Sequence, residues 1–203
     1  VDTPPDLAGA MNAVLAAHGR PEVPLHEVRH MVGRGARKLI ERGFETTGAP
    51  AEAEALDGHV AAFLAHYAAH IADGSVPFPG ARDELARLRA EGHTLGVCTN
   101  KPEALTHLLL DRLGLSPHFS AILGADTLPV RKPDPRHLME TIVRAGGDPK
   151  RAVMIGDSEI DAETAKAAGV KLVIFTFGYS AFDPATFGAD ALLHGYDELP
   201  AAL

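Results

Sequence analysis

Two aspartates four positions apart, Asp157 and Asp161, are the residues whose types and spacing best suit metal chemistry. They follow an apolar run, Val153–Ile155, and then Gly156, an order typical of a buried strand that turns into a helix. Side chains at i and i+4 lie on one face of a helix, and the first helical turn favours negative charge. Such carboxylates bind hard cations such as Mg²⁺ together with water and substrate oxygens. An ordinary acidic first turn is the alternative, and this stretch alone leaves both interpretations open.

Three further polar residues follow other predicted strands. Thr99 and Asn100 follow a strand predicted over Thr94–Cys98, and Lys132 lies in a proline-rich loop after one near Phe119–Leu123. Because the carboxyl ends of parallel strands meet at one edge of a sheet, we expect these residues to converge with the aspartates. Each could instead be a capping or surface residue. The combination of a hydroxyl, an amide, a lysine and two acids suits phosphoryl transfer, in which positioning and charge neutralisation supply most of the catalysis.

The elements that must position these side chains alternate between helix and strand from residue 81 onward. This order predicts an α/β core, a Rossmann-like doubly wound parallel sheet with helices on both faces. The predicted strands are Thr94–Cys98, Phe119–Leu123, Ala152–Ile155, Lys171–Phe175 and Ala191–Leu193, and the predicted helices are Ala81–Glu91, Pro102–Leu113, Arg136–Ala145 and Ser158–Ala168.

Residues 4–74, by contrast, show helical periodicity and no strand pattern. Helices are predicted from the opening prolines to Gly19, and over Leu25–Val32, Ala36–Phe44 and Ala51–Ala72. The segment Ser75–Gly80 then breaks the pattern with two prolines and a glycine. We therefore predict an inserted all-helical domain over residues 1–77 and an α/β domain over residues 78–203.

The helical domain contains two polar features that could have a function. His66 and His70 have a spacing that can bind zinc, but no acid or cysteine completes a site, so a solvated face is favoured. Gly33-Arg34-Gly35 reads first as an interhelical turn. It could also bring Arg34 or Arg37 close to an anionic ligand.

Composition excludes several classes of function. The chain has 203 residues, a net charge of −8 and a pI near 5.7, which argues against a nucleic-acid partner and requires local cations or a metal for any anionic substrate. The lone Cys98 lies in an apolar run, which predicts a buried structural thiol and a reducing compartment. No membrane span or signal peptide is visible, so we expect a cytoplasmic protein without a membrane partner. A monomer and a homodimer both stay open.

In the candidate residues described above, the sequence resembles the haloacid dehalogenase superfamily of phosphatases. Thr99 in VCTNK matches its second motif, Lys132 in RKPDP its third, and GDSEID at residues 156–161 its fourth. Residues 4–74 match the cap that follows the first motif, so the resemblance covers essentially the whole chain. The combination of VDTPPDL, VGRGARKL, RKPDP, GDSEID and TFGY is similar to phosphatases of 2-phosphoglycolate within that superfamily.

The resemblance implies a role for each matching residue of the core. Asp157 would bind Mg²⁺ directly, and Asp161 would support the metal directly or through water. Thr99 and the backbone of Asn100 would hold the phosphoryl oxygens. Lys132 would neutralise charge on the nucleophile and on the phosphoryl group.

The resemblance also implies the reaction. It is Mg²⁺-dependent hydrolysis of a small phosphorylated metabolite, favouring 2-phosphoglycolate, through an aspartyl-phosphate intermediate. Arg34 and Gly35 in the cap would help to select the organic part of the substrate, and closure of the cap would exclude water.

One part of the superfamily pattern does not occur in residues 1–203: the first motif, an apolar strand followed by Asp-x-Asp-x-Thr. This motif supplies the nucleophilic aspartate and the general acid/base. Asp2 and Asp6 lie at the start of the cap and are poor candidates for that role. We therefore expect the motif upstream of Val1, and no turnover by residues 1–203 alone. In that case Thr94–Cys98 and Ala152–Ile155 should not pair, and should lie about 9–10 Å apart, two strand spacings.

Two other functions stay open. A sugar-phosphate phosphatase or a phosphomutase of the same superfamily would use the same core residues. A non-catalytic binding protein would have lost the nucleophile, although retention of Thr99, Lys132 and both aspartates argues against it.

Overall fold

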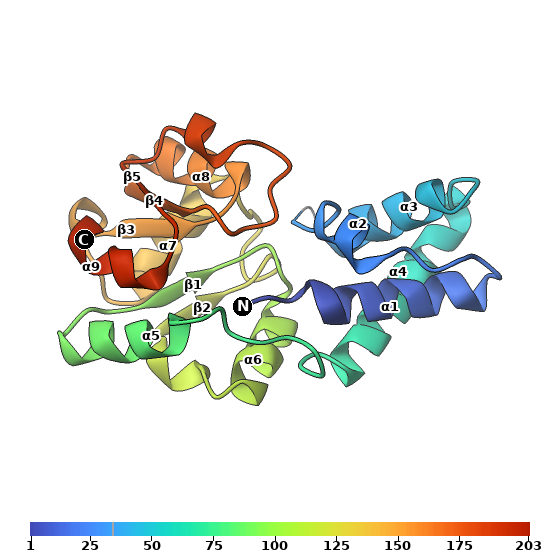
Figure 1. Cartoon of the computed structure of the whole chain (residues 1–203). Helices are drawn as coiled ribbons and strands as arrows, with labels where there is room; N and C mark the ends of the chain where they lie inside the picture. The colour runs from blue at the N-terminus through green and yellow to red at the C-terminus, as the bar shows by residue number, and fades with distance from the viewer. Residues whose placement is uncertain (34) are drawn as a thin grey trace. The chain divides into compact units, whose positions relative to one another are not determined.

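A computed structural model describes residues 1–33 and 35–203 (Figure 1). The chain divides into two compact units, Val1–Val76 and Pro77–Leu203. The first unit is built from helices, and the second alternates helices with strands. No helix in the described part of the chain has the length and apolarity needed to cross a bilayer.

The helical unit is organised around α4. Its helices are α1 (Pro4–Ala17), α2 (Leu25–Arg29), α3 (Ala36–Thr46) and α4 (Ala53–Ala69), and α1 and α3 both pack against α4. Apolar side chains at helical spacing fill the space between them, including the fully buried Met11, Leu15, Ile40, Phe63 and Tyr67. Helix α2 ends earlier than its apolar pattern predicts, because the chain leaves helical geometry after the capping residue His30.

The two ends of the helical unit are tied together by Asp2 and Asp6. Asp2 and Val76 exchange backbone hydrogen bonds of 2.8 and 3.3 Å in an antiparallel bridge. The buried Asp6 carboxylate accepts the N–H groups of Gly74 and Ser75, both at 2.8 Å, and the Ser75 hydroxyl at 2.5 Å. These contacts give Asp2 and Asp6 structural roles within the helical unit.

In residues 77–203, five short strands form two parallel sheets. One sheet pairs β1 (Gly96–Cys98) with β2 (Ala121–Leu123), and the other has the order β3 (Val153–Gly156), β4 (Lys171–Phe175), β5 (Ala191–Leu193). The helices are α5 (Ala81–Ala90), α6 (Glu103–Arg112), α7 (Pro135–Arg144), α8 (Glu159–Ala168) and α9 (Leu199–Ala202). The α/β class and the alternation predicted from the sequence are confirmed.

Helices cover both faces of the sheet around β4. Successive strand residues point to opposite faces. On one face Leu172 and Ile174 join a cluster with residues of α7 and α8, and on the other Val173 and Phe175 pack with Leu88 of α5 and the C-terminal residues. This arrangement buries β4 on both sides from Leu172 to Phe175.

Strands β1 and β3 do not pair with each other: in the described chain β1 pairs only with β2, and β3 only with β4. The expectation that these two strands are not neighbours is confirmed, whereas their predicted separation stays a prediction. Their surroundings differ from those of β4. Ile155 in β3 is 36% exposed, while Val173 and Ile174 in β4 are 0% exposed. Strands β1 and β3 therefore belong to separate sheets in the described chain.

Candidate active site

Asp161 is built into the start of helix α8. Its Oδ2 atom accepts the Ser158 hydroxyl at 2.8 Å and the backbone N–H groups of Asp157 and Ser158 at 3.1 and 3.2 Å. The Ser158 hydroxyl in turn accepts the Asp161 N–H at 3.4 Å. This reciprocal capping box satisfies N–H groups that a helix start leaves unpaired. Sequence reasoning singled out Asp161 and missed Ser158, although the Ser-x-x-Asp spacing carries the signal.

The other carboxylate oxygen of Asp161 is paired with Lys132. The Lys132 Nζ lies 2.5 Å from Asp161 Oδ1, and the two side chains are 12% and 5% exposed. Burial opposes ionisation of both groups, but the close pairing outweighs it, so the pKa of Asp161 is lowered and that of Lys132 is raised. Both oxygens of Asp161 are thus engaged by protein donors, which favours a supporting role over direct metal binding.

Asp157 is in a different electrostatic situation. Burial, followed by the charge of Asp161, raises the pKa of Asp157, and this is only partly offset by Lys132 and by a hydrogen bond from the Tyr179 backbone N–H. Ionisation of a carboxylate whose pKa burial raises is costly, and a bound cation would relieve that cost. Asp157 is therefore the better candidate for a direct Mg²⁺ ligand.

Two glycines make room for the two acids. A Cβ atom on Gly178 would clash with the carboxylate of Asp157, and one on Gly156 would clash with the Cβ and carboxylate of Asp161. No side chain can be accommodated at either position without moving an acid. The sequence placed Gly178 only at the end of a strand, and its contact with Asp157 could not be inferred from it.

Asn100 connects the end of β1 to the loop that carries Lys132. Its Nδ2 donates to the Lys132 carbonyl oxygen at 3.0 Å, so Asn100, Lys132 and Asp161 form one network. The Thr99 hydroxyl accepts the Lys101 N–H at 3.1 Å, and its backbone N–H donates to Leu123 O at 3.1 Å. Within the described chain the contacts of Thr99 thus support its own turn and the β1–β2 ladder.

The buried His137 contacts the carboxyl ends of both β1 and β2. His137 on α7 is 0% exposed; its Nε2 donates to Gly124 O at 2.9 Å, which leaves Nδ1 to accept from the Cys98 thiol at 3.2 Å. Burial is the main cause that raises the pKa of Cys98, so the residue stays a neutral thiol. This agrees with a structural role for Cys98.

The residues proposed for substrate selection are less well defined. Arg34 lies outside the described residues. Gly35 precedes α3 as its capping residue, with a φ of 90°, and is exposed. Arg37, the other cation of this stretch, forms an ion pair with Asp57.

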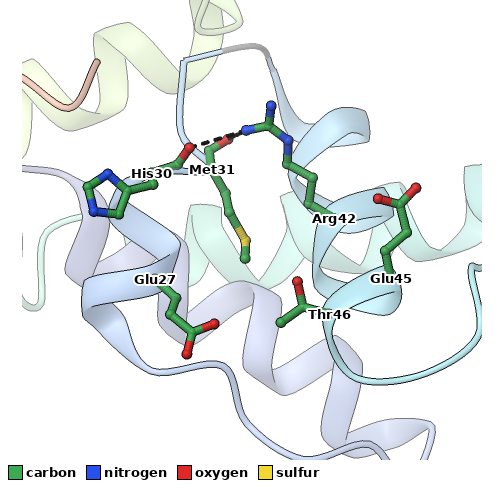
Figure 2. A pocket seen from close by; sticks show the side chains of 6 residues that line it. All are labelled: Glu27, His30, Met31, Arg42, Glu45 and Thr46. Atoms are coloured by element: carbon green, nitrogen blue, oxygen red, sulfur yellow. Dashed lines mark hydrogen bonds between the residues drawn. The ribbon is translucent and has the colours of Figure 1, made fainter. Parts of the chain in front are cut away.

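A pocket of about 370 Å³ lies on the helical unit (Figure 2). It is lined by Glu27, His30, Met31, Arg42, Glu45 and Thr46. Arg42 donates to the carbonyl oxygens of His30 and Met31 at 3.2 and 3.4 Å, and therefore braces the end of α2. With this cation engaged and two glutamates nearby, the pocket is poorly suited to an anionic ligand.

The donors at the core site fit Mg²⁺ as an ion held partly by the protein. No group of three or more His, Cys, Asp or Glu residues able to hold a metal occurs in residues 1–33 and 35–203. Mg²⁺ is commonly held by only one or two carboxylates, together with water and phosphate oxygens. Asp157, whose ionised form is disfavoured by burial, fits that requirement, and Asp161 orders the turn that carries it.

The network of Asn100, Lys132 and Asp161 at the carboxyl ends of parallel strands, together with a helical unit, is typical of one class of protein. The chain belongs to the haloacid dehalogenase-like hydrolase family, whose profile matches residues 1–175. It is 49% identical over 202 residues to phosphoglycolate phosphatase from Caulobacter vibrioides, an alignment that covers 100% of this chain and 85% of the relative.

Two solved structures show the same fold. A predicted phosphoglycolate phosphatase from Haemophilus somnus superposes with a TM-score of 0.90 at 25% identity, covering 98% of this chain and 91% of the other. CbbY from Rhodobacter sphaeroides in complex with xylulose-(1,5)bisphosphate superposes with a TM-score of 0.81 at 25% identity, covering 100% of this chain and 93% of the other.

Proposed function

We propose that this protein is a Mg²⁺-dependent phosphomonoesterase whose substrate is 2-phosphoglycolate. The observation that carries the proposal is the pair of buried acids at the start of α8, one ion-paired with Lys132 and the other with a pKa raised chiefly by burial. Its similarity to a phosphoglycolate phosphatase supports the choice of substrate. The net charge of −8 supports a small metabolite as partner instead of a nucleic acid.

Each residue of the network has a defined task in this proposal. Mg²⁺ bound at Asp157 would supply positive charge to the phosphoryl oxygens. An ammonium group has three donors, so Lys132 keeps two beyond its bond to Asp161 for the phosphoryl group and the nucleophile. Asp161 binds the ammonium group of Lys132, and Asn100 binds its backbone carbonyl. The Asn100 N–H and the Thr99 hydroxyl donate to the phosphoryl oxygens in this proposal.

The nucleophile in this proposal is an aspartate on a strand that pairs between β1 and β3. Neither strand has a partner on that side in the described chain, and Asn100 Oδ1 is buried without a donor among the described residues. A carboxylate oxygen on such a strand would attack phosphorus as the ester P–O bond breaks, and the second aspartate of the same Asp-x-Asp pair would give its proton to the leaving oxygen. Water would then attack the aspartyl-phosphate, releasing phosphate and the free carboxylate.

Phosphate release from a substrate panel tests the function. The full-length protein should hydrolyse 2-phosphoglycolate with Mg²⁺ present, and a chelator should abolish the reaction. Absence of Mg²⁺-dependent phosphate release from every small phosphoester would refute the proposal and leave a non-catalytic binding protein as the alternative.

A sugar-phosphate substrate is the second candidate, supported by the similarity to CbbY in complex with xylulose-(1,5)bisphosphate. The ratio of kcat/KM values for 2-phosphoglycolate and for sugar mono- and bisphosphates decides between them. A phosphomutase would instead return an isomeric phosphoester with little free phosphate.

A further inference from the structure

Five aromatic side chains of the second unit form one cluster beside the candidate metal site. They are Phe78, Phe175, Phe177, Tyr179 and Tyr196, and in a chain without tryptophan they are a large share of the aromatic rings. Phe175 is 4.8 Å from Phe177 and 4.5 Å from Tyr196, measured between ring centroids. The cluster joins the end of β4 to the C-terminal part of the unit.

Phe78 enters this cluster from a different part of the chain. It precedes α5 in the sequence, and its ring centroid is 4.8 Å from that of Phe177 and 6.2 Å from that of Tyr179. The Phe78 side chain is half-buried, whereas Val76, two residues earlier, is 55% exposed. The segment that leads into α5 is therefore anchored on the loop after β4 through one ring.

That loop forms one wall of the space around Asp157. Phe177 and Tyr179 flank Gly178, whose missing side chain admits the Asp157 carboxylate, and the Tyr179 N–H donates to it. The charge of Asp157 also acts on Tyr196, another member of the cluster. Burial, and then this charge, raise the pKa of Tyr196 to about 12. Packing of the aromatic cluster and placement of Asp157 are thus linked through a single loop.

We propose that Phe78 is a positioning residue for Asp157, acting through Phe177 and Tyr179. Asp161 is held by a close lysine and a capping serine, whereas the Asp157 carboxylate accepts the Tyr179 N–H of this loop. Loss of the Phe78 ring removes packing from the outer side of the loop and allows the Tyr179 N–H to shift. This inference rests on the proposed function in one respect, that Asp157 binds Mg²⁺.

Linkage adds a second consequence. If packing of the Phe78 ring raises the affinity for Mg²⁺, bound Mg²⁺ must shift the equilibrium between packed and unpacked Phe78 toward the packed state. The two effects have the same factor. The backbone amides of Phe78 and Gly80, which lie beside Pro77 and Pro79 in this segment, should therefore exchange hydrogen more slowly when Mg²⁺ is added. This readout is independent of catalysis.

Calorimetric titration of the full-length protein with MgCl₂ tests the proposal. Phe78→Ala should weaken Mg²⁺ binding about 10-fold, as removal of a residue that supports a metal ligand commonly does. Phe78→Leu, which keeps much of the apolar volume, should recover most of the affinity. Val76→Ala is the matched control on the same segment, and should leave the Mg²⁺ affinity unchanged because its side chain is exposed.

The possible outcomes separate this inference from the proposed function. If the wild type binds no Mg²⁺, the proposed function fails. If the wild type binds Mg²⁺ and Phe78→Ala binds it equally well, or Val76→Ala weakens it as much, the role of Phe78 is refuted while the function stands. Should Phe78→Ala not fold, Phe177→Ala, which removes its ring partner, replaces it, and unchanged Mg²⁺ affinity in that variant overturns the inference.

Discussion

The two acids of the site differ in how the protein meets their charge. Asp161 has a lysine, a serine hydroxyl and two N–H groups, whereas Asp157 has a raised pKa and a backbone donor from Tyr179. One carboxylate therefore stabilises the fold, whereas the other is costly to ionise and is the one that we propose as the Mg²⁺ ligand. The same residue type, four positions apart, performs two different tasks.

Replacing each acid by asparagine should separate these tasks. Asp157→Asn removes a poorly compensated buried charge, so we expect the unfolding free energy in the absence of metal to stay equal or rise, and Mg²⁺ affinity to fall at least about 100-fold. Asp161→Asn leaves Lys132 without its partner, and should lower the unfolding free energy by about 3–5 kcal/mol. Thermal unfolding with and without Mg²⁺ measures both effects. Equal destabilisation by the two substitutions would contradict the assignment.

At the scale of elements, each critical contact joins segments that are distant in sequence. Lys132 reaches Asp161 across 29 positions, and Asp6 reaches Ser75 across 69. Helices and strands set the positions of these residues, but turns and linkers hold the final geometry. The clamp made by Asp6 is the clearest case, because one carboxylate satisfies three donors of the returning segment.

Removal of that carboxylate should be costly to the helical unit. In Asp6→Ala the N–H groups of Gly74 and of the buried Ser75, and the Ser75 hydroxyl, lose their acceptor, and we expect a loss of about 3 kcal/mol in the free energy of unfolding. Ser75→Ala removes one of the three donors and should cost about 1 kcal/mol. Urea denaturation of the two variants checks the ratio. A smaller effect for Asp6→Ala than for Ser75→Ala would rule out the clamp.

Much of this architecture could be predicted from local sequence patterns. Hydrophobic periodicity, together with the glycines and prolines that end helices and strands, predicted β4 and β5 at their observed bounds. The same patterns placed Thr99, Asn100, Lys132 and both aspartates after strands or at helix starts. Local patterns could not show that Asp161 is saturated by donors, that Gly178 makes room for Asp157, or that Phe78 packs on Phe177. Each of these depends on which distant segments the fold brings together.

At the scale of the whole molecule, each unit buries one tyrosine with a raised pKa. The pKa of Tyr67 in the helical unit is raised by burial and then by the charge of Asp6, and that of Tyr196 in the second unit is raised to about 12 by burial and then by Asp157. Both rings therefore resist ionisation in the folded protein. The unfolded chain does not share this resistance.

The consequence is a loss of stability in alkaline solution. Below pH 10, the ordinary tyrosine pKa, folded and unfolded states both keep these protons, so the groups add no pH dependence. Above it the unfolded chain releases them first, and stability should fall by about 1.4 kcal/mol per pH unit for each group until its folded pKa is reached. Tyr67→Phe should remove one such contribution. Urea midpoints from pH 8 to 11 test this, and identical slopes for both proteins would contradict it.

The bridge between Asp2 and Val76 also affects how this unit can be exchanged among proteins. Because its first and last residues lie side by side, the helical unit replaces a short turn in a host chain with little added cost of loop closure. A graft cut at these two positions carries its own clamp, Asp6 with Ser75, within the transferred segment. We therefore expect that recombination or design can insert the helical unit into another protein as one segment, without changes to the domain that receives it.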